Sequence, residues 1–148
     1  MEPSLTLHDP VGDGPAACLS IGSDDDIVRA RQRARAYALA LGFSSPEATL
    51  VATAISELAR NIVQYAQYGE IALQAIERDG RSGLLVIASD RGPGIPESAK
   101  LAFDSPQTHA TSGLGLRALK RFMDDVQLLS MAGEGTTVRV TRWKPHLP

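Results

Sequence analysis

The chain has 148 residues, the length of one domain, and hydrophobic residues make up 43% of it, which is enough for a buried core. Its formal net charge is −2 and no basic block stands out, so nucleic acid is not an expected partner. The lone cysteine, Cys18, cannot form an intramolecular disulfide, and there is no signal-peptide pattern or bilayer-length apolar run, so we expect a cytoplasmic protein without membrane contact.

The N-terminal part of the chain predicts a tail, a strand and a helix. Residues 1–16 are rich in proline, glycine and acids, and we expect them to form a flexible tail before a single domain at 17–148. The short apolar run 17–21 predicts a strand. Ser23 and the acids after it supply an N-cap and a first turn for a helix that runs to about Leu41. That helix is expected to stop at Gly42.

A second, longer helix is predicted from Ser45, with Pro46 at its first helical position. Apolar residues then recur with a period of 3.6, which is typical of a helix that buries one face. They are Ala48, Val51, Ala52, Ile55, Leu58, Ala59, Ile62, Val63 and Ala66. Gly69 marks the end of this region.

A hairpin and a long loop follow the second helix. The runs 71–76 and 84–89 predict strands, joined by a turn at 78–81. Residues 91–112 carry Pro, Gly, Ser and Thr without periodicity, and loops of that length often serve a function. We expect 97–112 to form a lid.

The C-terminal part predicts a helix and a second hairpin. Residues 113–125 favour a helix, and 126–131 and 136–143 favour strands. Hairpins make neighbouring strands antiparallel, and all the helices can lie on one face of the resulting sheet. The predicted fold class is therefore α/β, a two-layer α/β sandwich with a mixed, mainly antiparallel sheet.

Glu57 and Asn61 form the first candidate for a functional site. They are four residues apart on the second helix, so they share a face, and that face lies off the apolar stripe. The amide oxygen of Asn61 suits the Mg²⁺ of a magnesium–nucleotide complex, and Glu57 suits a base that accepts a proton from an attacking hydroxyl. Taken alone, such a pair is more often a polar pair on a solvated helix face.

Asp90, Gly92 and Gly94 form the second candidate. Asp90 ends an apolar strand, and a carboxylate there can accept a hydrogen bond from the exocyclic amine of adenine while repelling the keto oxygen of guanine. The two glycines allow the backbone to come close to a base. An ordinary turn after a strand explains the same residues about equally well.

A third glycine cluster opens the predicted helix at 113–125. Backbone N–H groups at a helix start bind phosphate, and an ordinary capped helix start is the alternative. The residues concerned are Ser112, Gly113, Leu114, Gly115 and Leu116. The pattern also matches a dinucleotide fingerprint, but a loop and not a strand precedes it, so we reject that interpretation. Thr136, after a glycine turn at 133–135, is a further candidate for contact with the base.

Taken together and in order, these segments resemble those of the GHKL ATPases, the family of gyrase, Hsp90, histidine kinases and MutL. Glu57…Asn61 is similar to the N box, Asp90-x-Gly92-x-Gly94 to the G1 box, and Gly113-x-Gly115-Leu116 to the G2 box. The segment from Gly133 to Thr136 is similar to the closing glycine–threonine motif. The resemblance covers roughly residues 17–143 and implies the histidine-kinase-like ATPase fold with ATP and Mg²⁺ as cofactors.

Within that family the chain is similar to the small serine kinases of bacterial partner-switching and stressosome systems, with features of anti-sigma-factor kinases before Gly113. The resemblance implies transfer of phosphate to a Ser or Thr of a STAS-domain antagonist protein. It also implies a second partner, such as a phosphatase or a sigma factor. An ATP-gated anti-sigma or switch protein with little catalysis, or a bare ATPase module, is the alternative. A homodimer is left open.

Overall fold

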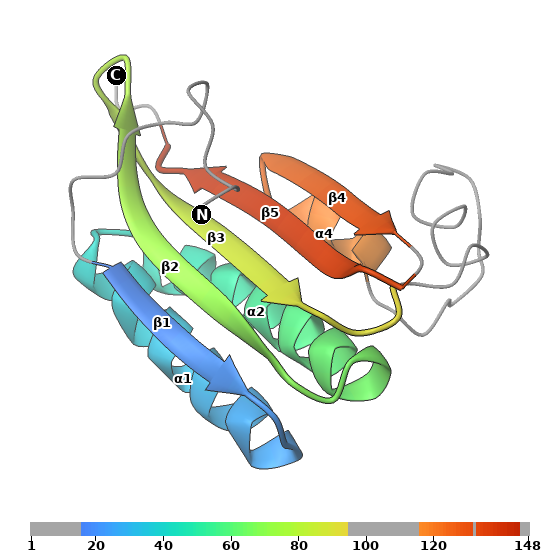
Figure 1. Cartoon of the computed structure of the whole chain (residues 1–148). Coiled ribbons are helices and arrows are strands. Elements are labelled where there is room, and N and C mark those ends of the chain that lie inside the picture. The colour runs from blue at the N-terminus through green and yellow to red at the C-terminus, as the bar shows by residue number, and fades with distance from the viewer. Residues whose placement is uncertain (1–15, 95–115, 132, 146–148) are drawn as a thin grey trace.

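The structure is a computed structural model that describes residues 16–94, 116–131 and 133–145. Its elements in chain order are β1 (Ala16–Ile21), α1 (Asp24–Ala40), α2 (Ser45–Tyr65), β2 (Gly69–Arg78), β3 (Arg81–Asp90), α4 (Leu116–Phe122), β4 (Asp125–Met131) and β5 (Gly135–Trp143). The strands form one five-stranded sheet in the order β1-β2-β3-β5-β4 (Figure 1). Every pairing among these strands is antiparallel.

Both long helices begin at caps that the sequence provides. The Ser23 side chain accepts a hydrogen bond from the backbone N–H of Asp26, and α1 is capped at Leu41 before Gly42. Ser44 caps α2, and Glu47 reaches back to the backbone N–H of Ser44 to complete a capping box. Because Ser44 and not Ser45 is the cap, Pro46 lies at the second helical position and not the first.

The central hairpin follows its predicted turn and has longer strands than predicted. Asp79 and Gly80 both adopt positive φ, 53° and 78°, which gives a two-residue turn of the twist that hairpins favour. The register then pairs Arg78 with Arg81 and runs without a break to Gly69 opposite Asp90. This unbroken ladder extends both strands beyond their apolar stretches and places Asp90 inside the sheet at its end.

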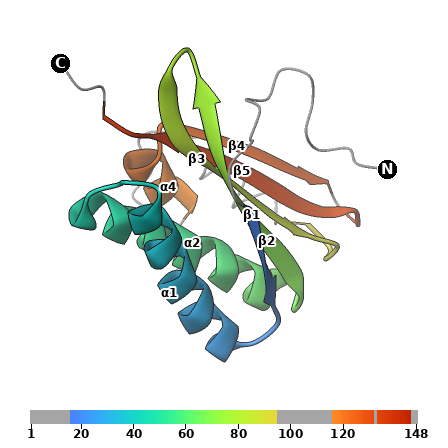
Figure 2. The same cartoon turned by 90° about the vertical axis from the view of Figure 1, so that its left-hand side faces the viewer.

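The domain has two layers, with the helices on one face of the sheet (Figure 2). α1 and α2 lie side by side in the helical layer, both contact the strands, and side chains of both layers form one core. The largest fully buried side chains include Ile55 and Leu58 of α2 and Leu73, Leu84 and Val86 of the sheet. The two-layer sandwich predicted from the sequence is confirmed, although the described sheet is wholly antiparallel instead of mixed.

The last predicted helix ends earlier than expected. α4 stops at Phe122, and Asp125 already begins β4. Asp124 is bound into the sheet, since its N–H donates to the carbonyl of Thr141 and its carboxylate accepts from the N–H of Trp143. The predicted start of this helix, the predicted lid at 97–112 and most of the predicted tail lie outside the described residues. In the part of the chain that is described, no helix has the length and apolar character needed to cross a bilayer.

Candidate functional site

A narrow cavity lies between the C-terminal half of α2 and the end of the sheet where β3 finishes. Its walls come from α2, β3 and β5: Leu58, Asn61, Ile62, Tyr65, Ala88, Asp90, Thr136 and Val138. The cavity measures about 20 Å³, which is room for about one water molecule and too little for a purine base. It nevertheless brings together three of the residues that the sequence predicted for a nucleotide site, Asn61, Asp90 and Thr136.

Asp90 is the last residue of β3, and the sheet register places it between Gly69 of β2 and Thr136 of β5. Its Oδ1 accepts a hydrogen bond from the backbone N–H of Gly92 at 2.9 Å. Burial raises the pKa of the Asp90 carboxyl above its ordinary value of 3.8, and hydrogen bonds from the backbones of Gly92 and Thr136 partly oppose that rise. A carboxylate has about four lone-pair positions, so it retains acceptor capacity toward the cavity.

Asn61 is unusual because its buried side-chain amide has no hydrogen-bond partner. Both Oδ1 and Nδ2 are buried without one. Buried polar groups are nearly always paired, and an unpaired one costs about 1–3 kcal/mol, so this amide calls for an explanation. Its place on the cavity wall, across from Asp90, supplies one. The amide is positioned to bind something that enters the cavity.

Glu57 lies one helical turn before Asn61 and is not part of the cavity wall. Its Oε2 accepts a hydrogen bond from Nη1 of Arg60 at 2.7 Å, and the two side chains form an ion pair three residues apart on α2. The Glu57 side chain is 25% exposed and that of Arg60 is 49% exposed. The two candidate residues of the helix therefore differ: the amide atoms of Asn61 are buried on the cavity wall, while the Glu57 side chain is partly exposed to solvent.

The glycines at this end of the sheet are required by close backbone contacts. A Cβ on Gly92 would lie 2.6 Å from the Cβ of Ala66, so Gly92 allows the chain after β3 to pack against the end of α2. A Cβ on Gly135 would collide with the carbonyl oxygen of Asp90. In addition, the N–H of Gly133 donates to the carbonyl of Pro93 at 2.9 Å. The close approach seen here is between protein segments, whereas the sequence suggested an approach to a base.

Thr136 contributes a hydroxyl that is already paired. Its Oγ1 lies 2.9 Å from Oγ of Ser130, and both residues are buried. The apolar walls of the cavity, and Tyr65 in particular, were not among the predicted site residues. The signal for Tyr65 was present, since it follows Asn61 by four residues and shares its helix face.

The predicted phosphate segment falls mostly outside the described residues. Ser112, Gly113, Leu114 and Gly115 are not described, and Leu116 is the first residue of α4. Nothing in the structure tests the part predicted for them. α4 itself packs on the hydrophobic core through the fully buried Leu119.

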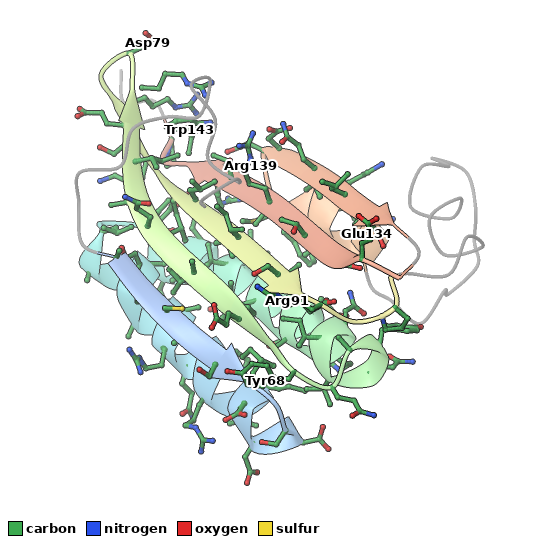
Figure 3. The ribbon with its side chains drawn as sticks, viewed as in Figure 1. Tyr68, Asp79, Arg91, Glu134, Arg139 and Trp143 are labelled. Carbon is green, nitrogen blue, oxygen red and sulfur yellow. The ribbon has the colours of Figure 1, made fainter. Side chains whose placement is uncertain are left out.

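Larger hollows also lie on the described surface, and two of them measure several hundred Å³. One, of about 350 Å³, lies at the other end of the sheet beside Lys144. The second, of about 620 Å³, lies over the open face near Tyr68, Arg91 and Glu134, at the end of the sheet where β3 finishes (Figure 3). Neither has a buried polar side chain without a partner on its wall. The small cavity is the better candidate for a binding site because its unpaired amide points to a ligand.

Comparisons with known proteins agree with the fold and the motifs. Residues 23–142 match the model of the histidine kinase-like ATPase domain. The serine/threonine-protein kinase RsbT of Bacillus subtilis is 44% identical over 127 residues, which cover 86% of this chain and 96% of that protein. The anti-sigma F factor of Caldanaerobacter subterraneus subsp. tengcongensis is 30% identical over 120 residues, covering 77% of this chain and 82% of that protein.

Among solved structures, the catalytic domain of the histidine kinase ThkA resembles this chain with a TM-score of 0.48 and 16% identity. The similarity covers 86% of this chain and 96% of that domain. So distant a similarity adds no argument of its own. The family model, which spans most of the chain, and the 44% identity to RsbT confirm the family predicted from the motifs. This chain therefore belongs to the family of histidine kinase-like ATPase domains.

Proposed function

We propose that this chain is an ATP-dependent serine/threonine-protein kinase of a bacterial partner-switching pathway. The acceptor in this proposal is a Ser or Thr of a STAS-domain antagonist protein. The observation that carries it is the unpaired amide of Asn61, which lines one cavity together with Asp90 and Thr136. The RsbT relative, which carries the name of serine/threonine-protein kinase, supports the reaction type.

The adenine base is proposed to bind at Asp90. A carboxylate accepts from the exocyclic amine of adenine and meets the keto oxygen of guanine unfavourably, so ATP should bind better than GTP. Apolar side chains on both sides of Asp90, such as Ile62 and Val138, suit the faces of a purine. Because the cavity is smaller than a base, its walls must move apart as the nucleotide enters.

Asn61 is the proposed protein ligand of Mg²⁺. An amide oxygen is a hard donor, and Mg²⁺ bound to nucleotide usually takes only one or two ligands from protein. The unpaired Oδ1 of Asn61 fits that requirement. Mg²⁺ would neutralise charge on the phosphates that are transferred. Backbone N–H groups at the start of α4, in the segment from Ser112 to Leu116, are the proposed contacts for those phosphates.

Glu57 is the proposed general base. As the hydroxyl oxygen of the acceptor bonds to the γ-phosphorus, the bond from phosphorus to the β–γ bridging oxygen breaks and ADP leaves. The hydroxyl proton passes to the carboxylate of Glu57. Glu57 is partly exposed to solvent, which suits a general base because an acceptor protein must reach it from outside.

A protein acceptor is preferred to a small molecule because the polar groups of the cavity are all assigned to the nucleotide. The proposed docking surface is formed by the arginines of α1, Arg29, Arg31, Arg33 and Arg35. Within that set, Arg35 hydrogen-bonds to Ser45 and Thr49 of α2, and Arg29 pairs with Asp26. Arg31 and Arg33 are the exposed pair left to meet a partner. A phosphatase or a sigma factor is the proposed second partner once the kinase is released.

An ATP-gated binding protein with little catalysis is the second candidate. The relatives that are anti-sigma F factors favour it, including that of Geobacillus stearothermophilus, 30% identical over 116 residues. Glu57 favours the kinase, because a protein that only binds has no need of a base beside the site. The two proposals differ in whether phosphate leaves the nucleotide for a partner.

The deciding experiment incubates the protein with γ-labelled ATP and Mg²⁺ and with STAS-domain proteins from its own genomic neighbourhood. We expect label on a Ser or Thr of one of them, and loss of that label with Asp90→Asn. Calorimetry should show weaker ATP binding by Asp90→Asn, by about 1.5–3 kcal/mol for a lost charge-assisted hydrogen bond. Binding of a STAS protein without any labelling would favour the second candidate. Equal ATP affinity in both forms would refute the assignment of Asp90.

A further inference from the structure

Arg60 has no part in the proposed function, although it makes the direct contact with Glu57. Its Nη1 donates to Glu57 Oε2 at 2.7 Å. Spacings of three and four residues place Arg60 and Asn61 on opposite sides of Glu57 along the helix surface. The Asn61 side is the buried cavity, and the Arg60 side is exposed. Glu57 therefore lies between the proposed nucleotide side and the side open to solvent.

The ion pair affects how available the Glu57 carboxylate is. A general base needs an oxygen within reach of the hydroxyl that it deprotonates. The guanidinium donates to Oε2, so this oxygen is engaged while the ion pair is formed. An exposed ion pair of this kind changes an equilibrium constant only by a factor of about two, so another partner can replace it at little cost in free energy.

The chemistry of Arg60 indicates what that partner is. A guanidinium presents a planar fork of donors that fits a carboxylate. Arg60 faces solvent, so the group that draws it away must arrive with a molecule from outside and not with the nucleotide in the cavity. On the proposed function, that molecule is the acceptor protein.

We propose that Arg60 is a positioning residue that holds Glu57 in the free protein and moves to a carboxylate of the docked acceptor protein, which leaves Glu57 facing the acceptor hydroxyl. This inference rests on the proposed kinase function. Its consequence is that the free protein hydrolyses ATP more slowly than it would without Arg60, because the base is paired for most of the time until the acceptor docks. Acceptor docking and activation of the base are then one event.

The test compares Arg60→Ala and Arg60→Lys with the wild type in the full chain. Two reactions are measured with Mg-ATP: hydrolysis without acceptor, and transfer to the STAS protein that the wild type phosphorylates. For Arg60→Ala we expect hydrolysis to rise about two- to threefold, which is the most that releasing a pair worth a factor of about two can give. The KM for the acceptor should rise roughly tenfold, the loss of one charged hydrogen bond. The KM for ATP should not change. Arg60→Lys should restore most of the acceptor KM.

Two further variants separate this inference from simpler effects. Arg78→Ala removes one positive charge at the far hairpin, where Arg78 stacks on Trp143, and should leave both reactions unchanged. In a Glu57→Ala background, Arg60→Ala should no longer raise hydrolysis, because the carboxylate that it held is gone. Thermal melting confirms that each variant is folded.

Unchanged hydrolysis and acceptor KM in Arg60→Ala would overturn the inference while leaving the kinase proposal intact. A rise in the KM for ATP in place of the acceptor KM would assign Arg60 to the nucleotide and would also overturn it. Absence of transfer by the wild type to any STAS protein would remove the proposed function, and the inference with it.

Discussion

The two ends of the sheet contrast in how their polar groups are used. At the hairpin end, Lys144 donates from Nζ to the carbonyl of Leu41 at 2.9 Å and so caps the C-terminus of α1. Its backbone N–H donates to Ser82, and its carbonyl accepts from Arg81. At the other end, Asn61 is buried without a partner and Asp90 is buried enough for its pKa to rise.

This difference indicates where the chain does its chemistry. At the hairpin end, the pairing of Lys144 and Arg81 stabilises the fold. Arg142 leaves its buried Nε unpaired there, but its other nitrogens contact the carbonyl of Phe122 and the carboxylate of Glu47. At the Asp90 end, an unpaired amide and a partly desolvated carboxyl lower the stability of the fold. Such costs are common in sites whose binding groups are fixed before the ligand arrives. The cavity that contains the unpaired amide is much smaller than the hollow at the hairpin end, about 20 Å³ against about 350 Å³, so the state of the polar groups guides this assignment and not the volume.

The largest effect is expected from Glu57→Ala. ATP binding should be largely retained, because Glu57 is not in the cavity wall. Phosphate transfer to the acceptor should slow by about 10²–10⁴-fold, the usual contribution of a general base. Single-turnover transfer and calorimetry on the same preparation measure both properties. Transfer at the wild-type rate would remove Glu57 from the mechanism and favour the switch protein.

Gly135→Ala and Gly80→Ala test the two ends directly for stability. Both glycines have positive φ, 96° and 78°, so both substitutions strain the backbone, by about 1–2 kcal/mol. A Cβ at 80 meets nothing within 4 Å, whereas one at 135 collides with the backbone of Asp90. We expect Gly135→Ala to lower the free energy of unfolding by at least about 3 kcal/mol. Equal losses in urea denaturation would show that the Asp90 end is not tightly packed.

Asn61→Leu should separate stability from binding. Removing an unpaired buried amide is expected to raise the free energy of unfolding by about 1–3 kcal/mol, while stabilisation by Mg-ATP is lost. Thr136→Val is the matched control, because it removes a buried hydroxyl that is paired with Ser130 and should lower stability. Thermal melting with and without Mg-ATP measures both variants. A less stable Asn61→Leu would mean that the amide has a structural partner.

The pH dependence of ATP affinity should follow Asp90. Its raised pKa means that it takes up a proton above pH 3.8, and the charged form accepts the amine of adenine more strongly than the neutral form does. Affinity should therefore fall as pH decreases through the raised pKa, by at most about tenfold per pH unit. The free energy of unfolding should change in the opposite direction to ATP affinity. Partial burial favours the neutral carboxyl of Asp90 in the folded protein, so its contribution to stability is present at low pH and is lost as pH rises through the raised pKa.

Calorimetry across that range is compared at each pH with Asp90→Asn, which subtracts titration of the phosphates. A pH dependence that is the same in both proteins would show that Asp90 does not contact the base.

The smallest effect is expected at the hairpin end. Lys144→Met keeps the apolar stem and removes the charge that caps α1, so the free energy of unfolding should fall by about 0.3–1 kcal/mol. ATP binding should be unchanged, because Lys144 lies at the opposite end of the sheet from Asp90. Denaturation and calorimetry together check this. A loss of ATP affinity would show that the two ends are coupled.

The long periodic elements could be predicted because they depend on local properties. The 3.6-residue period of α2, the cap at Ser23 and the turn at Asp79-Gly80 act within a few residues and all appear in the structure. Element ends were less predictable. β2 extends to Gly69 and Arg78 because its hydrogen-bonded pairing with β3 continues beyond the apolar residues. α4 ends at Phe122 because Asp124 is hydrogen-bonded to the sheet.

Of the candidate site, sequence spacing determined that Glu57 and Asn61 share a helix face and that Asp90 ends a strand. That Asn61, Asp90 and Thr136 share one cavity depends on how α2 crosses the sheet and on the register of β3 with β5, which only tertiary packing decides. Asn61 and Glu57 share a helix face, but only Asn61 lines the cavity, where its amide atoms are buried. Whether a polar group is paired depends on neighbours distant in sequence, so only the tertiary structure could reveal that the Asn61 amide has no partner.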